Sequence, residues 1–481
     1  MIPINTFDVF DTLIARRCIH PTNIFALLEE KYTLPGFANA RQQAEQDLIG
    51  QTYTLNDIYN NLRKFIDIGK LSLETLKQAE IEEELINVIA IQENISKVKD
   101  GDLLISDMYL PKKWVKALLE KAGLQKEVGL IVSNYGKHSG TIWPKIQSMF
   151  SITRHLGDSP HADGLSAAHY GIDFGITEIS QITQLEKIFF DINLPTIGEI
   201  LRQIRLETWN ENIFERKLQE FQFSFNFPIL LFSSLILYDV AKNLKKKKVV
   251  FSARDCCLWK DLFETLFPNE FDYEYFYTSR YSKCLSDDDY LEYSNSIITD
   301  DCILVDLCGS GWTTEFFAQK LKVQRLDTFF IHQMPQDRDY MQSVMNSKCH
   351  FHHIILNETE ELRNHLLEIA SFAKHPMLKT MKSIDGNFLP VFFPETRSDL
   401  EMNYVSIQHE TFKKCINTYK KRNLSPQTIN MGHDISTQLI KILYRIMSRD
   451  IIINFLFSIT FFQENNSIEN KLRMLVSQGR H

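Results

Sequence analysis

Four short apolar runs in the first 180 residues each end in polar residues, and segments with helical periodicity separate them. The runs are "FDVFDTL" (7–13), "LLISD" (103–107), "VGLIVSN" (128–134) and "ITRHLGDSP" (152–160). The intervening segments place apolar residues three and four positions apart, which is typical of amphipathic helices. Strands that alternate with helices favour a parallel sheet with crossover helices. The pattern therefore predicts a doubly wound α/β fold.

Carboxylates, a hydroxyl and a lysine would gather at one edge of this sheet. Ligands of doubly wound sheets bind beyond the carboxyl ends of the strands. The polar residues expected at that edge are Asp8, Asp11, Thr12, Ser106, Asp107, Lys137, Asp158 and Asp163. Burying an unpaired carboxylate is costly, so aspartates this close to apolar strands indicate a functional site.

The order of these motifs resembles that of the haloacid dehalogenase-like (HAD) hydrolase superfamily, over residues 1 to about 180. The family's first motif is D-x-x-x-T after an apolar strand, which corresponds to residues 8–12. Its second motif is a serine or threonine at a strand end, here Ser106. Its third motif is a lysine ahead of a helix, here Lys137 in "SNYGKHSGTIW". The fourth is G-D-x-x-x-x-D, which corresponds to residues 157–163.

The resemblance implies a hydrolase that works through an aspartyl-phosphate intermediate on a small phosphorylated metabolite, such as a sugar phosphate. The catalytic residues would be Asp8, Ser106 and Lys137. The ligands of a Mg²⁺ cofactor would be Asp8, the Phe10 backbone carbonyl, Asp158 and Asp163. The substrate would contact Thr12, Ser106 and Asp107. Mg²⁺ prefers hard oxygen ligands and offsets the repulsion between a carboxylate and a phosphate, so the residue types suit it.

One position departs from the family pattern. Phosphatases of the superfamily carry a second aspartate, a general acid and base, two residues after the nucleophile, and this chain has Phe10 there. Asp11 would point to the opposite face of an extended segment, so we interpret it as a turn residue. The dehalogenase branch of the superfamily also has an aromatic residue at this position. The alternative chemistry is therefore attack of the aspartate on a carbon atom, which forms a carboxylic ester. We favour phosphate chemistry, because "DVFDTL" with "SDMYLP" resembles a bacterial group tied to surface-polysaccharide genes.

Periodicity and the resemblance together divide the chain into five regions. They are a HAD-like core (1–17 and 99–195), a helical cap insertion (18–98), a helical connector (196–244), a second α/β domain (245–355) and a helical C-terminal region (356–481). A cap of this kind excludes water from the site and selects the substrate.

The second α/β domain has its own polar residues at predicted strand ends. The candidate residues are Arg254, Asp255, Arg280, Asp306, Ser310, Gly311 and Thr313. The spacing D-x-x-x-S-G-x-T (306–313) resembles the diphosphate-ribose loop of phosphoribosyltransferases, and backbone N–H groups in such a turn can hold phosphate. The alternative is a structural glycine turn packed against Trp312.

Composition excludes some classes of protein. A net charge of -8 argues against a general nucleic-acid binder, and the 8 cysteines show no metal-binding spacing. The apolar runs at 227–241 and 451–462 are shorter than the ~18 residues that a membrane-spanning helix needs. We therefore expect a cytoplasmic protein without a membrane span, and self-association into a homo-oligomer stays open.

Three functional hypotheses remain. The first is the phosphohydrolase, with a role in surface-polysaccharide biosynthesis. The second is a weakly active HAD domain, with a transferase or nucleotide- or sugar-phosphate-binding function in the second α/β domain. The third is a structural assembly factor of a cell-envelope polysaccharide pathway, for which substitution of Asp8 would change nothing.

Overall fold

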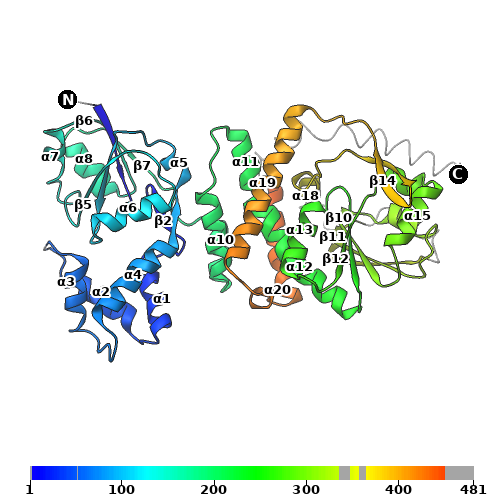
Figure 1. Ribbon diagram of the computed structural model, residues 1–481, viewed down its shortest axis with the longest axis horizontal. Helices are drawn as coiled ribbons and strands as arrows, with labels where there is room; N and C mark the ends of the chain where they lie inside the picture. Colours follow the sequence, from blue (N-terminus) through cyan, green and yellow to red (C-terminus); the bar gives the residue numbers. More distant parts are fainter. Residues whose placement is uncertain (1–2, 51, 335–346, 357–364, 450–481) are drawn as a thin grey trace. The chain divides into compact units, whose positions relative to one another are not determined.

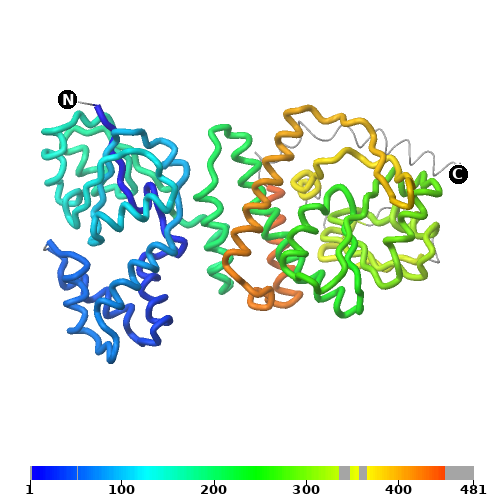
Figure 2. Tube along the Cα trace, viewed as in Figure 1, coloured from blue at the N-terminus to red at the C-terminus, as the bar shows by residue number. Residues whose placement is uncertain are grey.

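The computed structural model describes residues 3–50, 52–334, 347–356 and 365–449. The chain divides into two compact units, Met1–Asn210 and Glu211–His481, called unit 1 and unit 2 below. Figure 2 follows the path of the chain through each of them. Each unit is built on a five-stranded parallel sheet, so the predicted α/β fold class is confirmed.

The sheet of unit 1 has the strand order β5-β4-β1-β6-β7, with the first strand of the chain at its centre (Figure 1). Its strands are β1 (Pro3–Asp8), β4 (Leu103–Asp107), β5 (Gly129–Ser133), β6 (Ser151–Gly157) and β7 (Phe174–Ile176). The strand order reverses between β1 and β6, and such a switch point is where open α/β sheets bind ligands. The sequence patterns anticipated four of these strands and missed the short edge strand β7.

Both faces of this sheet are buried. On β4, Leu104 belongs to one apolar cluster, whereas Leu103 and Ile105 belong to another that contains Trp143 and Ala167. Alternate residues of a strand point to opposite faces, so helices cover both sides of the sheet. The covering elements that follow the strands are α6 (Lys112–Lys121), α7 (Trp143–Gln147), η1 (Pro160–Leu165) and α8 (Ser166–His169).

The segment between β1 and β4 forms the helical insertion expected for residues 18–98. Its helices are α1 (Asn23–Tyr32), α2 (Phe37–Gln46), α3 (Leu55–Leu62), α4 (Leu73–Asn87) and α5 (Gln92–Ile95). Thr54 and Ser72 cap α3 and α4 through their side chains, as their positions in the sequence indicate. The chain enters through β2 (Ile14–Arg16) and returns through β3 (Val88–Ala90), and these two strands pair antiparallel.

The insertion shares its apolar core with the sheet. Phe7 and Leu104 of the sheet lie in one continuous cluster with Ile24 and Leu76 of the insertion. A fully buried ion pair, Arg41 Nε to Glu80 Oε2 at 2.8 Å, lies within the insertion. The Arg41 guanidinium also lies 4.9 Å from the ring centroid of Tyr109, which follows β4. Helices α9 (Gln184–Asp191) and α10 (Pro195–Leu206) complete the unit.

The sheet of unit 2 has the order β12-β11-β10-β8-β9, so its strand order reverses between β8 and β10. Its strands are β8 (Lys248–Ser252), β9 (Asp272–Phe276), β10 (Cys302–Gly309), β11 (Leu326–Gln333) and β12 (Cys349–Leu356). The helices between them are α13 (Cys257–Leu266), α14 (Arg280–Cys284), α15 (Asp288–Ile297) and α16 (Trp312–Ala318).

The expected connector 196–244 does not form a separate region. Its first helix, α10, belongs to unit 1, whereas α11 (Ile213–Phe221), η2 (Gln222–Asn226) and α12 (Phe227–Asn243) belong to unit 2. The continuous run Ile213–Asn243 is the one described helix that is long and apolar enough to cross a membrane, and 78% of its apolar window is buried inside the protein. This burial agrees with the expectation of a core helix.

The C-terminal region was expected to be helical, and the structure corrects this in part. Helices α18 (His365–Ala370), α19 (Asp399–Lys421), η3 (Pro426–Ile429) and α20 (His433–Arg449) are present. A hairpin of β13 (Leu378–Ile384) and β14 (Asn387–Phe392) interrupts them. Asp385 and Gly386 form its turn, both with positive φ, which is the Asp-Gly signature of a two-residue hairpin. The apolar run 451–462 lies outside the described residues.

Candidate functional site

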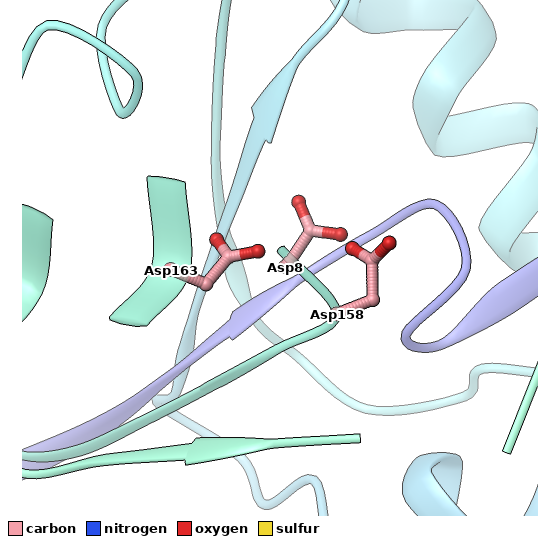
Figure 3. A group of neighbouring side chains, drawn as sticks. All are labelled: Asp8, Asp158 and Asp163. Atoms are coloured by element: carbon pink, nitrogen blue, oxygen red, sulfur yellow. The ribbon is translucent and has the colours of Figure 1, made fainter. Parts of the chain in front are cut away.

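Three carboxylates meet at the switch point of the unit 1 sheet (Figure 3). Asp8 is the last residue of β1, Asp158 follows β6 directly, and Asp163 lies on η1. One oxygen from each lies within 4.8 Å of the others. Among the described residues this acidic cluster is the one group of three or more side chains arranged to hold a metal ion. The sequence predicted all three of its members.

Lys137 joins two of these carboxylates. Its Nζ forms an ion pair with Asp8 Oδ1 and another, at 2.7 Å, with Asp163 Oδ1. All three side chains are buried. Burial alone would lower the pKa of Lys137, but the two carboxylates outweigh burial and raise it. Lys137 therefore stays protonated and places a fixed positive charge beside Asp8.

Asp163 is held by further contacts. His155 Nε2 lies 3.0 Å from Asp163 Oδ1, and the backbone N–H of Ser159 donates to Oδ2 at 3.0 Å. On its other side, His155 Nδ1 lies 2.8 Å from Thr6 Oγ1. Both oxygens of Asp163 thus have protein partners. His155 was not among the residues that the sequence predicted for this site.

The cluster carries more negative than positive charge. Burial raises the pKa of Asp8 to about 8, the neighbouring Asp163 and Asp158 add to the rise, and Lys137 opposes it. Burial likewise raises the pKa of Asp158 to about 6. Burial would also raise the pKa of Asp163, but its bond to His155 and the charge of Lys137 lower it below the ordinary range. Two buried carboxylates and the half-buried Asp158 share one ammonium, so the cluster has an excess of negative charge that a cation would offset.

The loop that carries Lys137 is fixed by Asp107. Its carboxylate accepts hydrogen bonds from the backbone N–H groups of Lys137 and His138, each at 3.0 Å, and from Ser133 Oγ at 2.7 Å. The Ser166 hydroxyl donates to the Lys137 carbonyl at 2.7 Å. Both oxygens of Asp107 thus position the Lys137 loop, and the expected contact of Asp107 with substrate stays a prediction.

The two residues predicted to offer hydroxyl groups, Ser106 and Thr12, are both buried. Ser106 is buried near the end of β4, and no described side chain bonds to its hydroxyl. Thr12 is fully buried, and its Oγ1 also lacks a hydrogen-bond partner among the described residues. The Thr12 carbonyl accepts a hydrogen bond from Asn94 Nδ2 at 2.8 Å, which fixes the turn after β1. Sequence reasoning did not single out Asn94.

Position 10 has no acidic side chain, because it is occupied by Phe10, whose ring packs under the Arg16 guanidinium. Its ring centroid is 4.8 Å from Arg16 Cζ, and the Arg16 guanidinium pairs with Glu84 of α4 at 2.7 Å. Asp11 has a φ of 57° and its N–H donates to the Ile14 carbonyl at 2.7 Å, which fits the turn role expected for it. No interaction shown for the described residues defines a role for the Phe10 carbonyl, so its part in metal binding stays a prediction.

The residues predicted as a second site also come together. A pocket of about 150 Å³ at the carboxyl ends of β8 and β10 is lined by Arg254, Asp255, Arg280, Asp306, Ser310, Gly311 and Thr313. A Cβ at Gly311 would lie 2.9 Å from the Phe351 ring, and φ is 87° there. The positive φ and the close approach of the Phe351 ring therefore both require a glycine at this position.

No protein-family model matches this chain, and no curated protein matches its sequence. The functional interpretation therefore rests on the residues and on their geometry.

Proposed function

We propose that unit 1 is a Mg²⁺-dependent phosphohydrolase of the haloacid dehalogenase-like type, with Asp8 as its nucleophile and a small phosphorylated metabolite as its substrate. The observation that carries this proposal is the convergence of Asp8, Asp158 and Asp163 around the Lys137 ammonium at the switch point of a parallel sheet. A structural salt bridge needs one acid for each base. Three carboxylates around one lysine, two of them buried and Asp158 half-buried, are better explained by a ligand that brings positive charge.

The donor set fits Mg²⁺. Carboxylate oxygens are hard ligands, and Asp8 and Asp158 face a common space with Asp163 (Figure 3). Asp8, Asp158 and the Phe10 carbonyl would hold the ion directly. Asp163 would act through water, because both of its oxygens already accept hydrogen bonds. When bound, Mg²⁺ supplies a Lewis acid that offsets negative charge on the phosphoryl group.

The chain's own residues then have separate tasks. A carboxylate oxygen of Asp8 attacks phosphorus, the ester P–O bond breaks, and the departing alkoxide takes a proton from water. Lys137 keeps a positive charge beside the nucleophile, and the Ser106 hydroxyl donates a hydrogen bond to a phosphoryl oxygen. Water next attacks phosphorus of the aspartyl phosphate, which releases inorganic phosphate and restores the Asp8 carboxylate. Position 10 offers no acid to either step.

Phosphate release tests this function. Wild type and Asp8→Asn are compared on p-nitrophenyl phosphate and a panel of sugar phosphates, each with Mg²⁺ or with EDTA. We expect Mg²⁺-dependent release that falls about 10³-fold or more in Asp8→Asn. Asp191→Asn, an exposed aspartate of α9, is the matched control and should keep full release. Equal release by Asp8→Asn, or none by a folded wild type, would contradict the proposal and favour a structural role for unit 1.

A further inference from the structure

The pocket of unit 2 lies where its sheet topology favours ligand binding. β8 lies between β9 and β10 in the sheet and precedes both in the chain. The chain therefore continues from β8 to β9 on one side of β8 and later crosses to β10 on its other side. Arg254 and Asp255 follow β8, and Asp306 lies on β10, whose end leads into the turn at Ser310. Ligands of open α/β sheets bind at such a reversal, beyond the carboxyl ends of the two strands.

Lys283 is the group in this pocket that the fold does not explain. It lines the pocket from α14 and is only 5% exposed. Within the described part of the chain, the one hydrogen bond of its ammonium group is a long contact of 3.4 Å to Thr314 Oγ1, and the group forms no ion pair there. A buried ammonium has three donors to satisfy and is costly to leave unpaired. Burial lowers the pKa of Lys283, and attraction to Asp306 opposes that shift.

Arg254 adds a second cation to the lining of the pocket. Its guanidinium lies 5.2 Å from the ring centroid of Phe372, and a guanidinium in such a cation–π contact can still donate hydrogen bonds from its edge. Arg280 also lines the pocket. Ser310, on the turn after β10, and Thr313, on α16, also line the pocket and carry hydroxyl groups. Cations and hydroxyls around one small cavity match the several oxygens of a phosphate.

Acids also line the pocket. Asp255 follows β8, Asp306 lies on β10, and Glu368 lies on α18. Burial raises the pKa of Asp255 to about 7, with Arg254 opposing the shift and Asp306 adding to it. Carboxyl groups accept hydrogen bonds from hydroxyls, and a pocket that holds both signs of charge suits a ligand with an anionic end and a hydroxylated end.

We propose that unit 2 binds a phosphorylated polyol in this pocket, with the phosphate on Lys283 and Arg254 and the hydroxyls on Asp255 and Asp306. Sugar phosphates and nucleotides share this chemistry. The proposal stands on residues of unit 2 alone and is independent of the function proposed for unit 1.

Hydrogen exchange on the full chain in EDTA locates the bound ligand. The probes are inorganic phosphate, ribose 5-phosphate, glucose 1-phosphate and adenosine monophosphate, with ribose as the uncharged control. We expect a phosphorylated probe to protect peptides that cover 253–255 and 306–314, and ribose to protect neither. Stronger protection by the sugar phosphates would identify a sugar phosphate as the ligand class, and stronger protection by adenosine monophosphate would identify a nucleotide. Protection confined to peptides of unit 1, or protection by no probe, would overturn the proposal.

Lys283→Met then separates a binding lysine from a structural one. Methionine keeps the length of the side chain and removes the unpaired charge, so we expect the melting temperature to rise and affinity for the protecting probe to fall about 10- to 100-fold. Lys320→Met is the matched control. Lys320 donates to the Cys284 carbonyl at 3.0 Å and to Ser286 Oγ at 3.1 Å, so its loss should lower the melting temperature and leave affinity unchanged. A folded Lys283→Met protein with unchanged affinity would refute the assignment.

Discussion

The carboxyl group of Asp163 lies directly against Gly157. A Cβ placed on Gly157 would be 2.2 Å from Asp163 Cγ, a separation that no packed structure allows. The glycine that precedes Asp158 is therefore fixed by the space that Asp163 needs, and the two ends of the G-D-x-x-x-x-D motif are one packing unit.

Gly157→Ala should displace Asp163 and, through their ion pair, Lys137. We expect a fall of about 10²-fold in phosphate release with a smaller loss of thermal stability, because a misplacement of about 1 Å is enough to disrupt a catalytic geometry. Gly164→Ala in the same segment is the control, since its Cβ would meet the half-exposed ring of Phe174 at 3.2 Å, and that ring can shift. Equal activity of both variants would show that Asp163 does not need this position.

The Asp107→Asn variant tests whether Asp107 positions Lys137 or contacts the substrate. An asparagine replaces one of the two oxygens that hold the Lys137 and His138 N–H groups. We expect kcat for p-nitrophenyl phosphate to fall about 10-fold or more while KM changes little, because the loss acts through the lysine. A rise in KM at unchanged kcat would instead assign Asp107 to substrate binding, as the sequence first indicated.

Phe10 predicts a strong dependence of turnover on the leaving group. Without an acid at this position, p-nitrophenolate, which leaves readily, should be released much faster than a sugar alkoxide. Phe10→Asp should raise release from sugar phosphates by about 10²-fold, the lower range for general acid catalysis, and affect p-nitrophenyl phosphate less. Phe10→Asn is the control, because asparagine is similar in size to aspartate but has no acidic proton to donate. The same gain in both variants would point to relief of packing under Arg16 and not to proton transfer.

Asp327 makes the stability of unit 2 sensitive to acid. It is fully buried on β11 and pairs with Arg325 at 2.7 Å, Lys246 at 2.8 Å and His352 at 2.9 Å. Burial would raise the pKa of Asp327, but these bonds outweigh burial and lower it. A folded-state pKa below the unfolded one contributes stability at neutral pH that is lost as the pH falls below about 4.

Chemical denaturation of wild type and Asp327→Asn at pH 7, 5 and 3 measures this contribution. We expect a difference of about 3–5 kcal/mol in unfolding free energy at pH 7, the usual cost of breaking a buried pair, and a shrinking difference toward pH 3. Asp385→Asn, at the exposed β13–β14 turn, should change nothing at any pH. A pH-independent difference would mean that Asp327 contributes through packing alone.

The sequence predicted four strands of the unit 1 sheet and the acidic cluster, because parallel sheets bring strand ends together. Asp8, Ser106 and Asp158 each follow an apolar run, so their meeting needed only the topology. The role of Asp107 could not be read in this way, because a carboxylate at a strand end can face either a ligand or a neighbouring loop. Its bonds to the Lys137 loop depend on a turn 30 residues further along the chain.

Other misses have different causes. The unit boundary inside the expected connector could not be placed, since α10 and α12 are both apolar helices and only packing assigns them to different cores. The β13–β14 hairpin did carry a signal, the Asp385-Gly386 pair, which the surrounding polar sequence obscured. The burial of Lys283 had no signal, because a lysine on a short helix is usually exposed.

The antiparallel pair of β2 and β3 holds together the two ends of the helical insertion of unit 1. Arg16 lies opposite Val88 in the ribbon, so the chain leaves the sheet and returns to it at one place, as it would for a segment acquired by a single insertion during evolution. The shared apolar cluster ties the same segment to Phe7 and Leu104. Homologues that carry a different insertion should therefore show compensating substitutions on β1 and β4. Homologues that lack the insertion should carry polar residues at the positions of β1 and β4 that it covers here.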